Sequence, residues 1–352
     1  MVIVGYDVGG AHLKVARIEN DRPVAVRQIV CPLWQGLDHL DRALAEAQPL
    51  TLGAHVIAVT MTGELSDLFE NRAAGVATLV DRLDTQHGGG VLFWMAERGF
   101  GDAASAKAHH ADVASTNFLA TAAATARLAP DALLVDMGST TTDLIAVRHG
   151  RPAALGLTDA ERLTSGELVY TGLTRTALMA IADEAPFRGQ RQRLVREYYA
   201  TAADARRVLG TLPDGVDLHA TADGRGQSRD ESVARFARML GRDTADGTDA
   251  DWRTAASAIL DRQLASILDG ARQVLSRVAL PDHAPVVAAG IGADVVADIA
   301  ARLGRPAATF GALTGATGDA ALWATRCAPA TAVALLASDL TWPGMAELIP
   351  SG

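Results

Sequence analysis

The feature of this sequence that most constrains its fold is a short pattern that occurs twice, once at the N-terminus and once before the middle of the chain. In each copy an apolar strand ends at an aspartate, a turn containing glycine follows, and a second apolar strand returns. Setting Asp7 on Asp136 aligns Gly9 with Gly138 and the two returning strands with each other. A repeated unit of this kind predicts an α/β fold built by duplication, with one copy in each half.

The length and composition of the chain agree with two folded domains. At 352 residues it exceeds what a single hydrophobic core usually serves. Hydrophobic residues make up 49% of the sequence, which excludes disorder as the dominant state. The net charge of −9, without a cluster of lysine and arginine, argues against binding to nucleic acid.

The cysteines and the apolar segments indicate the compartment. Cys31 and Cys327 are far apart and belong to no CxxC or His/Cys cluster, so we expect neither a disulfide framework nor a zinc site. The N-terminus lacks the basic segment and cleavage site of a signal peptide. Acids or glycines interrupt the apolar stretches before they reach the ~18 residues of a membrane span. These features predict a cytoplasmic protein without a membrane partner.

Apolar spacing predicts the elements outside the repeats. A buried strand is expected at residues 54–61 and helices at 163–182, 190–209 and 254–278. Residues 220–251 are rich in glycine, aspartate and arginine and show apolar periodicity only at 233–240, which is typical of a surface excursion or a partly mobile loop.

The first repeat carries Asp7, Gly9 and Gly10 at its turn. A carboxylate at the end of a buried strand, followed by glycines that let a ligand approach the backbone, suits a Mg²⁺–phosphate group. An ordinary hairpin turn is the alternative for so short a motif. Because the turn leads into a strand and not a helix, the Rossmann dinucleotide fingerprint is excluded.

The second repeat surrounds one glycine with an acid and four hydroxyl groups. Its candidate ligand-binding residues are Asp136, Gly138, Ser139, Thr140, Thr141 and Thr142. Hydroxyls and backbone amides suit phosphate oxygens, and the acid suits a metal ion. Two such loops in related positions predict a cleft that holds a phosphate chain from both sides.

A third motif lies near the end of the chain, where a buried strand enters a helix through Gly290 and Gly292. The N-terminus of a helix can accept an anionic group when glycines allow close approach. A tight connection between strand and helix is the alternative.

In this order the three segments resemble the phosphate-1, phosphate-2 and adenosine motifs of the superfamily that contains acetate and sugar kinases, heat-shock ATPases and actin. The resemblance covers the whole chain and implies an α/β fold of two duplicated ribonuclease-H-like domains around a central cleft. The first domain would comprise residues 1–127 and 316–352, and the second residues 128–315. Whether ATP binds is left open, because Ala11 stands where many kinases carry Thr or Ser.

Longer motifs are similar to one group of hydantoinase/oxoprolinase-related proteins. That group is the methanofuran-biosynthesis synthases of methanogens and their relatives in methylotrophic bacteria, which belong to tetrahydromethanopterin-linked one-carbon metabolism. The motifs are Asp7-Val-Gly-Gly-Ala-His-Leu-Lys14, Met61-Thr-Gly-Glu64-Leu, Asp136-Met-Gly-Ser-Thr-Thr-Thr-Asp143 and Gly166-Glu-Leu-Val-Tyr-Thr-Gly172.

The resemblance implies a transferase that makes an aryl ether. A phenol oxygen would displace diphosphate from an aminomethyl-furanmethyl diphosphate. The acceptor would be a phenol derived from tyramine or tyrosine, and whether it carries glutamyl groups is open. Expected partners are therefore small molecules, with a homodimer as an open alternative to a monomer.

Site roles follow from this resemblance. The two loops would hold Mg²⁺ and diphosphate, with Asp7 and Asp136 as the metal ligands. Lys14 is expected to neutralise charge on the leaving group. Glu64, which follows an apolar strand, is the candidate to accept the phenol proton or to bind the amine of the substrate, and helix capping is the alternative to both.

The expected acceptor pocket is lined by Glu167, Tyr170 and Arg175, because tyrosine and arginine suit an aromatic substrate that resembles an amino acid.

Two other classes of function stay open. One is an ATP-dependent small-molecule kinase, or a cyclic-amide hydrolase, of the same fold; ATP turnover that depends on Asp7 and Asp136 would favour it. The other is a nucleotide-sensing or actin-like assembly protein, which would form filaments without turnover.

Overall fold

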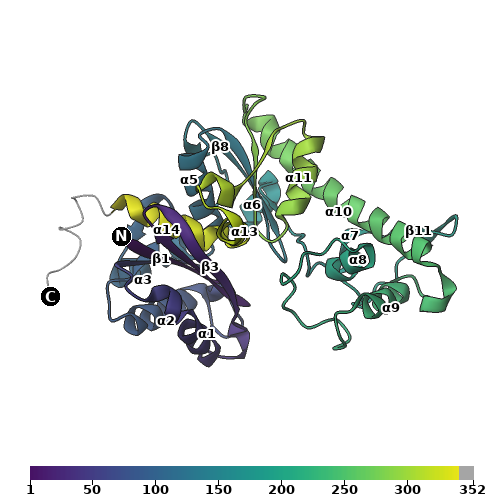
Figure 1. Ribbon diagram of the computed structural model, residues 1–352, viewed down its shortest axis with the longest axis horizontal. Helices are drawn as coiled ribbons and strands as arrows, with labels where there is room; N and C mark the ends of the chain where they lie inside the picture. The colour runs from purple at the N-terminus through teal and green to yellow at the C-terminus, as the bar shows by residue number, and fades with distance from the viewer. Residues whose placement is uncertain (341–352) are drawn as a thin grey trace.

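The computed structural model describes residues 1–340 and shows two sheet domains and a third, smaller lobe (Figure 1). The first sheet has the strand order β3-β2-β1-β4-β5-β6. Its first three strands are antiparallel neighbours, and β4 runs parallel to β1. The strands are β1 (Val2–Val8), β2 (His12–Glu19), β3 (Arg22–Val30), β4 (Val56–Met61), β5 (Leu92–Trp94) and β6 (Phe100–Gly101). The buried strand expected at 54–61 is confirmed.

Both faces of the first sheet are buried, so β1 is an almost continuous apolar run. Val4 and Tyr6 pack in the cluster formed with α1 (Asp38–Thr51) and α2 (Arg72–Gln86). Ile3, one position away and therefore on the opposite face, packs in the cluster that contains the last helix.

The second sheet has the order β10-β8-β7-β13-β14, with β9 paired to β8. The strands are β7 (Ala132–Met137), β8 (Thr142–Arg148), β9 (Arg151–Pro152), β10 (Leu168–Val169), β13 (Val286–Ala289) and β14 (Ala307–Thr309). One face packs against the C-terminal half of α10 (Asp249–Arg277) and against α11 (Ala293–Arg302).

Helices α5 (Asn117–Leu128) and α14 (Ala328–Leu340) lie between the two sheets. One hydrophobic cluster joins strand residues of both sheets through the small side chains of these helices. A Cβ at Gly5 would lie 2.0 Å from the carbonyl oxygen of Ala330, so α14 can rest on β1 only because residue 5 is glycine. The two halves therefore share one core.

The duplication is visible in the hydrogen bonds of the two turns. The Gly9 amide donates to the His12 carbonyl at 2.9 Å, and the Gly138 amide donates to the Thr141 carbonyl at 2.9 Å. In the strand pairs, Asp7 lies opposite Lys14 just as Asp136 lies opposite Asp143. These equivalences confirm the repeat and the predicted class of fold.

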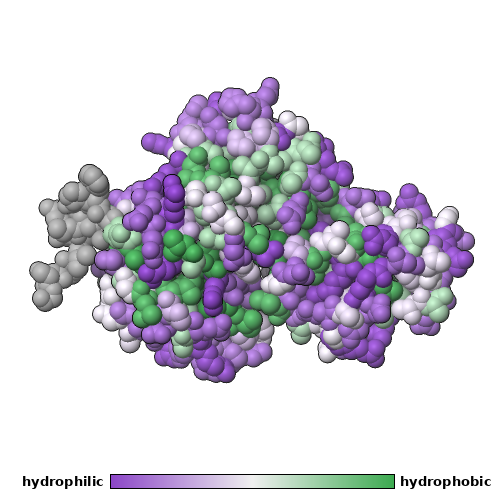
Figure 2. All heavy atoms as spheres, viewed as in Figure 1, coloured by the Kyte–Doolittle hydropathy of each residue, from purple (hydrophilic) through white to green (hydrophobic). Residues whose placement is uncertain are grey.

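The third lobe, which we call the insertion lobe (residues 174–262), is inserted between β10 and β13 and has a hydrophobic core of its own. Its elements are α7 (Leu178–Ile181), β11 (Glu184–Phe187), β12 (Gln190–Arg193), α8 (Ala202–Leu209), α9 (Arg229–Met239) and the N-terminal half of α10. Figure 1 shows α10 running from the second domain into this lobe, and Figure 2 shows a mainly hydrophilic surface there.

The short elements connect these layers. They are the helices α3 (Ala103–Ala108), α4 (His110–Val113), α6 (Asp159–Ser165), α12 (Phe310–Leu313) and α13 (Gly318–Arg326), and 3₁₀ turns at Leu33–Gln35, Gly63–Leu65, Ala96–Arg98 and Thr244–Asp246.

Three predicted elements differ from the structure. The helix expected at 163–182 is wrong, because Gly166 adopts a left-handed conformation and ends α6 there. The helix expected at 190–209 is wrong in its first half, where β12 pairs with β11. The excursion expected at 220–251 contains α9, which begins at Arg229, before the periodic stretch noted at 233–240, and whose Val233 and Phe236 enter the lobe core.

The predicted domain boundaries stay predictions. All strands of the first sheet lie within residues 1–127, and α14 packs on β1, β2 and β4. Helix α5, which the boundary after residue 127 assigns to the first domain, packs on β7 and β8 of the second sheet as well as on α14. The part of the predicted first domain beyond residue 340 lies outside the described residues.

Within residues 1–340, no single helix is long and apolar enough to cross a membrane. Helices α13 and α14 reach that length and composition only as a pair, which is bent by 103°.

Candidate active site

Asp7 stands at the end of β1 and is 1% exposed. The strand register places it opposite Lys14, whose Nζ donates a hydrogen bond to its Oδ2 at 2.9 Å. The other carboxylate oxygen, Oδ1, is buried and has no hydrogen-bond partner among the described residues. A buried carboxylate oxygen left without a partner is costly, which suggests that a ligand completes its coordination.

Lys14 remains a cation despite its surroundings. Burial alone would lower the pKa of its ammonium group, but the Asp7 carboxylate beside it and the nearby Asp136 raise that pKa above its ordinary value. A cation is therefore fixed between strand ends that carry two acids.

Asp136 occupies the equivalent position at the end of β7. Burial and the repulsion from Asp143 and Asp7 raise its pKa to about 7, and Lys14 opposes this shift. Asp7 and Lys14 are close enough to Asp136 to influence its pKa, so the two repeat-related strand ends lie near one another. The structure thus brings Asp7, Lys14 and Asp136 together as the sequence predicts.

The two repeats differ in the residue that lies opposite the strand-end aspartate. Asp143, which corresponds to Lys14, forms an ion pair with buried Arg162, and the Arg162 guanidinium lies 3.6 Å from the centre of the Phe118 ring. Asp143 is therefore held by an arginine of its own domain, whereas Asp7 is paired with Lys14 and keeps one carboxylate oxygen without a partner among the described residues.

Some backbone amides in the two turns donate hydrogen bonds within the protein, and others do not. The amides of Gly9 and Gly138 donate within their own turns, so any ligand contact at these two glycines stays a prediction and would not use those amides. Among residues 1–340, no protein acceptor engages the amides of Gly10, Ser139 or Thr140. Successive unpaired amides in a turn form a binding site for anions.

The hydroxyl groups of the second turn also differ in whether they are buried or accessible. Thr142 is fully buried and its Oγ1 donates to the Thr171 carbonyl at 2.7 Å, so the prediction that it binds ligand is wrong. Ser139 and Thr140 hydroxyls lie 3.4 Å apart at the accessible part of the turn, and Thr141 supplies the carbonyl that closes it.

The segment that starts the insertion lobe braces the second turn. The amides of Leu173 and Arg175 donate to the carbonyls of Gly138 and Ser139, each at 2.9 Å. A Cβ on Gly172 would lie 2.5 Å from the backbone nitrogen of Thr140, so only glycine allows this contact. The conformation of the turn therefore depends on the residues that follow β10.

Gly290 and Gly292 lie against the second turn. A Cβ on Gly290 would fall 2.4 Å from an Asp136 carboxylate oxygen, and one on Gly292 would fall 2.5 Å from the Met137 sulfur. Their amides donate to the carbonyls of Thr325 and Met137 at 2.8 and 2.9 Å. The structure gives these glycines a packing role, and their predicted contact with a cofactor stays a prediction.

Glu64 lies beside the first turn, because the Thr62 amide donates to the Val8 carbonyl at 2.9 Å. The Ser115 hydroxyl donates to one Glu64 oxygen at 2.7 Å, while the other is buried without a partner. Burial raises the pKa of Glu64, and the hydrogen bond from Ser115 opposes that shift. Such a carboxylate is suited to proton transfer. It caps no helix in the way the alternative proposed.

Two of the three residues predicted for the acceptor pocket do not line it. Glu167 is fully buried; its carboxylate accepts from the amides of Leu155 and Gly156 and pairs with Arg277, so it is structural. Tyr170 is 63% exposed and lines none of the described cavities. Arg175 does line a cavity beside the two turns.

Sequence reasoning missed the contact that joins the first domain to the insertion lobe. The rings of His12 and His219 meet with centroids 5.1 Å apart. Burial, together with His219, Lys14 and Arg175, lowers the pKa of His12 to about 3. The neighbouring Trp34 and Tyr198 were also missed, because no local motif signals a contact made across domains.

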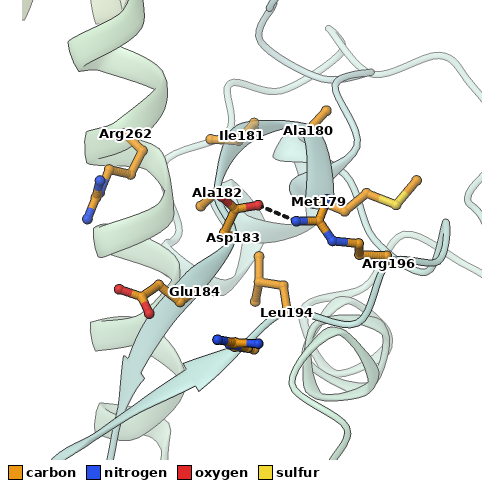
Figure 3. Close-up of a pocket in the computed structure, with 10 residues that line it drawn as sticks. Met179, Ala180, Ile181, Ala182, Asp183, Glu184, Leu194, Arg196 and Arg262 are labelled. Carbon is orange, nitrogen blue, oxygen red and sulfur yellow. Dashed lines mark hydrogen bonds and ion pairs between the residues drawn. The ribbon is translucent and has the colours of Figure 1, made fainter.

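The largest described cavity is a groove of about 620 Å³ in the insertion lobe (Figure 3). It is lined by residues 179–184 and by arginines, among which Arg196 pairs with Asp183. No residue of either turn lines it, so it is separate from the candidate active site.

The acids of the site suit a metal that keeps water ligands. Within residues 1–340, no group of three or more His, Cys, Asp or Glu side chains is placed to hold an ion. Asp7 and Asp136 are two carboxylates, one with an oxygen that lacks a partner. Mg²⁺ is commonly bound by one or two carboxylates together with water and substrate phosphates, so these residues fit it.

Comparison with solved structures agrees with this architecture. The nucleotide-free structure of acetone carboxylase, described as carrying out ATP-dependent acetone carboxylation, aligns with 86% of this chain and 67% of its own at a TM-score of 0.53 and 10% identity. At that identity the likeness shows the fold alone, which is the duplicated actin-like ATPase fold.

Comparison with known sequences is more specific. The model of the hydantoinase/oxoprolinase family matches residues 55–314. The (4-{4-[2-(gamma-L-glutamylamino)ethyl]phenoxymethyl}furan-2-yl)methanamine synthase of Methanocaldococcus jannaschii is 30% identical over 85% of this chain and 88% of its own. The synthase of the same name from Methanococcus vannielii is 29% identical over 49% of this chain and 75% of its own. The chain therefore belongs to the hydantoinase/oxoprolinase family and, within it, to the group of these methanofuran-biosynthesis synthases.

Proposed function

We propose that the protein is a transferase that joins a furanmethyl group to a phenol and releases diphosphate. The name of the relative from Methanocaldococcus jannaschii describes a product in which a phenoxy oxygen bonds to the methylene carbon of an aminomethylfuran. Disconnecting that ether gives a γ-glutamyltyramine-type phenol and an aminomethyl-furanmethyl group that must carry a leaving group. The facing anion-binding turns favour diphosphate as that group.

The bond changes follow from these substrates. The bond between the methylene carbon and the diphosphate oxygen breaks, and its electron pair leaves with diphosphate. The electron-rich furan stabilises positive charge that develops on the carbon. The phenol oxygen forms the new bond to that carbon and loses its proton. The task of the protein is to hold the leaving group, position the phenol and accept the proton.

The leaving group would be held from both domains. Free amides of Gly10, Ser139 and Thr140 suit the diphosphate oxygens, and Lys14 suits their negative charge. Asp7 and Asp136 would hold Mg²⁺, which neutralises charge on the departing diphosphate. The single observation that carries this assignment is the juxtaposition of the two acids and Lys14 at repeat-related strand ends.

The proton acceptor is Glu64 in this proposal. Its second carboxylate oxygen is buried without a partner, and Ser115 fixes the first at 2.7 Å. Because burial raises its pKa, its ionised form is a stronger base than an exposed glutamate.

The experiment is a turnover assay that measures diphosphate release from the furanmethyl diphosphate with γ-glutamyltyramine. Wild type is expected to need Mg²⁺, and Asp7→Asn and Asp136→Asn to lose at least about 100-fold in kcat, as expected when a group acting on transition-state charge is removed. Asp183→Asn, an exposed acid of the insertion lobe, is the matched control and should keep full activity. Saturable hydrolysis of ATP that needs both acids, without diphosphate release from the furan substrate, would contradict the proposal and favour an ATP-dependent kinase or hydrolase.

A further inference from the structure

A small cavity of about 170 Å³ lies between the first domain and the insertion lobe. Its lining residues are Trp34, Thr174, Arg175, Tyr198, Thr201, Asp204, Arg207, Asp217, His219, Ala220 and Thr221. Pockets that enclose whole drug-sized ligands are larger, about 300–1,000 Å³. This one is therefore sized for one part of a larger substrate.

The cavity lies beside the first and second turns. The backbone of Arg175, one of its walls, donates to the Ser139 carbonyl at 2.9 Å. His219, another wall, meets the ring of His12 in the turn of the first domain. A molecule bound here is next to any diphosphate held between the turns.

Several polar groups in the cavity have no protein partner among residues 1–340. Thr174 is 1% exposed, and its hydroxyl makes no hydrogen bond. The Nε2 atom of His219 is buried and also unpartnered. The guanidinium of Arg175 forms no ion pair, whereas Arg207 beside it pairs with Asp217. Buried polar groups are normally satisfied, so the Thr174 hydroxyl and the His219 Nε2 indicate a ligand. Arg175 is exposed, so its unpaired guanidinium is accessible to such a ligand.

The remaining walls include two aromatic side chains that the fold leaves half exposed. Trp34, in the 3₁₀ turn after β3, is 49% exposed, and its neighbour Leu33 donates its amide to the Gly10 carbonyl of the first turn at 2.9 Å. Tyr198, on the insertion lobe, is 51% exposed. Aromatic faces suit an aromatic ligand. They offer nothing to a diphosphate, which the turns already accommodate.

We propose that this cavity is the acceptor subsite: Trp34 and Tyr198 pack on the ring of the phenol, and Arg175 pairs with a carboxylate on its tail. This assignment rests on the proposed function and names the acceptor class as a phenol whose tail carries a carboxylate. The insertion lobe thus supplies the specificity for the acceptor, and the duplicated domains supply the leaving-group site.

The test separates the ring from the carboxylate by using two phenols. Calorimetry measures binding of γ-glutamyltyramine and of tyramine, which lacks the carboxylate, to wild type, Arg175→Gln and Trp34→Ala. Arg175→Gln should weaken γ-glutamyltyramine about 10- to 100-fold, the range for a lost charged hydrogen bond, and leave tyramine unchanged. Trp34→Ala should weaken both ligands about 3- to 10-fold through lost ring contact.

The matched control is Arg193→Gln, an exposed arginine of the separate groove in the same lobe, which should change neither affinity. Equal loss of both phenols in Arg175→Gln, no loss in either variant, or no binding to wild type would overturn the subsite. So would a rise in the KM of Arg175→Gln for the furanmethyl diphosphate with no change for the phenol. Calorimetry measures binding without turnover, so the subsite and the reaction can be tested separately. If the expected changes in affinity occur in a protein that releases no diphosphate, the subsite is upheld and the transfer reaction is rejected.

Discussion

At the scale of single residues, burial raises the pKa of two carboxyl groups of the site, Asp136 and Glu64. Asp136 is 9% exposed and close to two other acids, so its pKa rises to about 7. In the unfolded chain its pKa is near 3.9. The folded state therefore holds a proton on this group that the unfolded state has lost between about pH 4 and pH 7.

This difference predicts how Asp136→Asn changes stability. The stabilisation from protonated Asp136 is complete below about pH 4 and is lost as pH rises to about 7. The neutral amide avoids that loss, so without Mg²⁺ the variant should be more stable than wild type at pH 8, by a few kcal/mol as an order of magnitude. At pH 4 the difference should be absent.

The measurement is chemical unfolding at both pH values in the presence of a chelator, with Asp183→Asn as the exposed control. A stability gain of Asp136→Asn that is the same at pH 4 and pH 8 would contradict the assigned pKa.

At the residue scale, the sequence could indicate which strand-end residues lie near one another, and their roles stay predictions. Asp7, Lys14 and Asp136 come together because strand ends of a duplicated fold must meet at the cleft. The role expected for Glu167 is wrong, because its partner Arg277 is far away in sequence and only folding brings the pair together. A buried ion pair of this kind leaves no local signal.

At the scale of elements, the second turn depends on the segment after β10. Three backbone amides of residues 173–175 donate to Gly138 and Ser139, and Gln263 of α10 holds that segment by donating to the Gly172 carbonyl at 2.7 Å. Arg206 of α8 in turn donates to Gln263 at 2.8 Å. A buried chain of hydrogen bonds therefore connects the insertion lobe to the turn.

Gly172→Ala should disturb this connection. A Cβ there would lie 2.5 Å from the backbone of Ser139 and Thr140, so the turn must move. We expect the KM for the furanmethyl diphosphate to rise about 10-fold or more, since misplaced donors bind the leaving group poorly.

The control for that variant is Gly304→Ala, which has open space around it but a φ of +66°. It should lower the melting temperature through backbone strain of about 1–2 kcal/mol and leave KM unchanged. An unchanged KM in Gly172→Ala, with full activity, would show that the hydrogen bonds from residues 173–175 do not position the second turn.

Helices and strands could be predicted from sequence where a local pattern determines them, and not where tertiary contacts do. Strands of the repeats could be predicted because each is a short apolar run that ends at a turn. The helix expected at 163–182 and the first half of the helix expected at 190–209 were wrong, because tertiary hydrogen bonds and strand pairing override the helical spacing there. The second half of the latter is α8.

At the scale of the whole molecule, the two sheet domains form one structural unit and the insertion lobe forms another. The two sheet domains share a core through α5 and α14, which fixes the two turns relative to one another. The insertion lobe has a separate core and reaches the first domain where His219 meets His12. The repeat could be predicted from sequence, whereas the lobe could not, because nothing in its composition shows which surface it faces.

The central claim is that a phenol oxygen displaces diphosphate at carbon, between turns supplied by the two domains. The most direct measurement uses γ-glutamyltyramine labelled with ¹⁸O in its phenol and follows the label by mass spectrometry. We expect one equivalent of aryl ether that retains the label and one equivalent of unlabelled diphosphate, both dependent on Mg²⁺. Label recovered in an aryl phosphate formed from ATP, or diphosphate released without any ether, would contradict the claim.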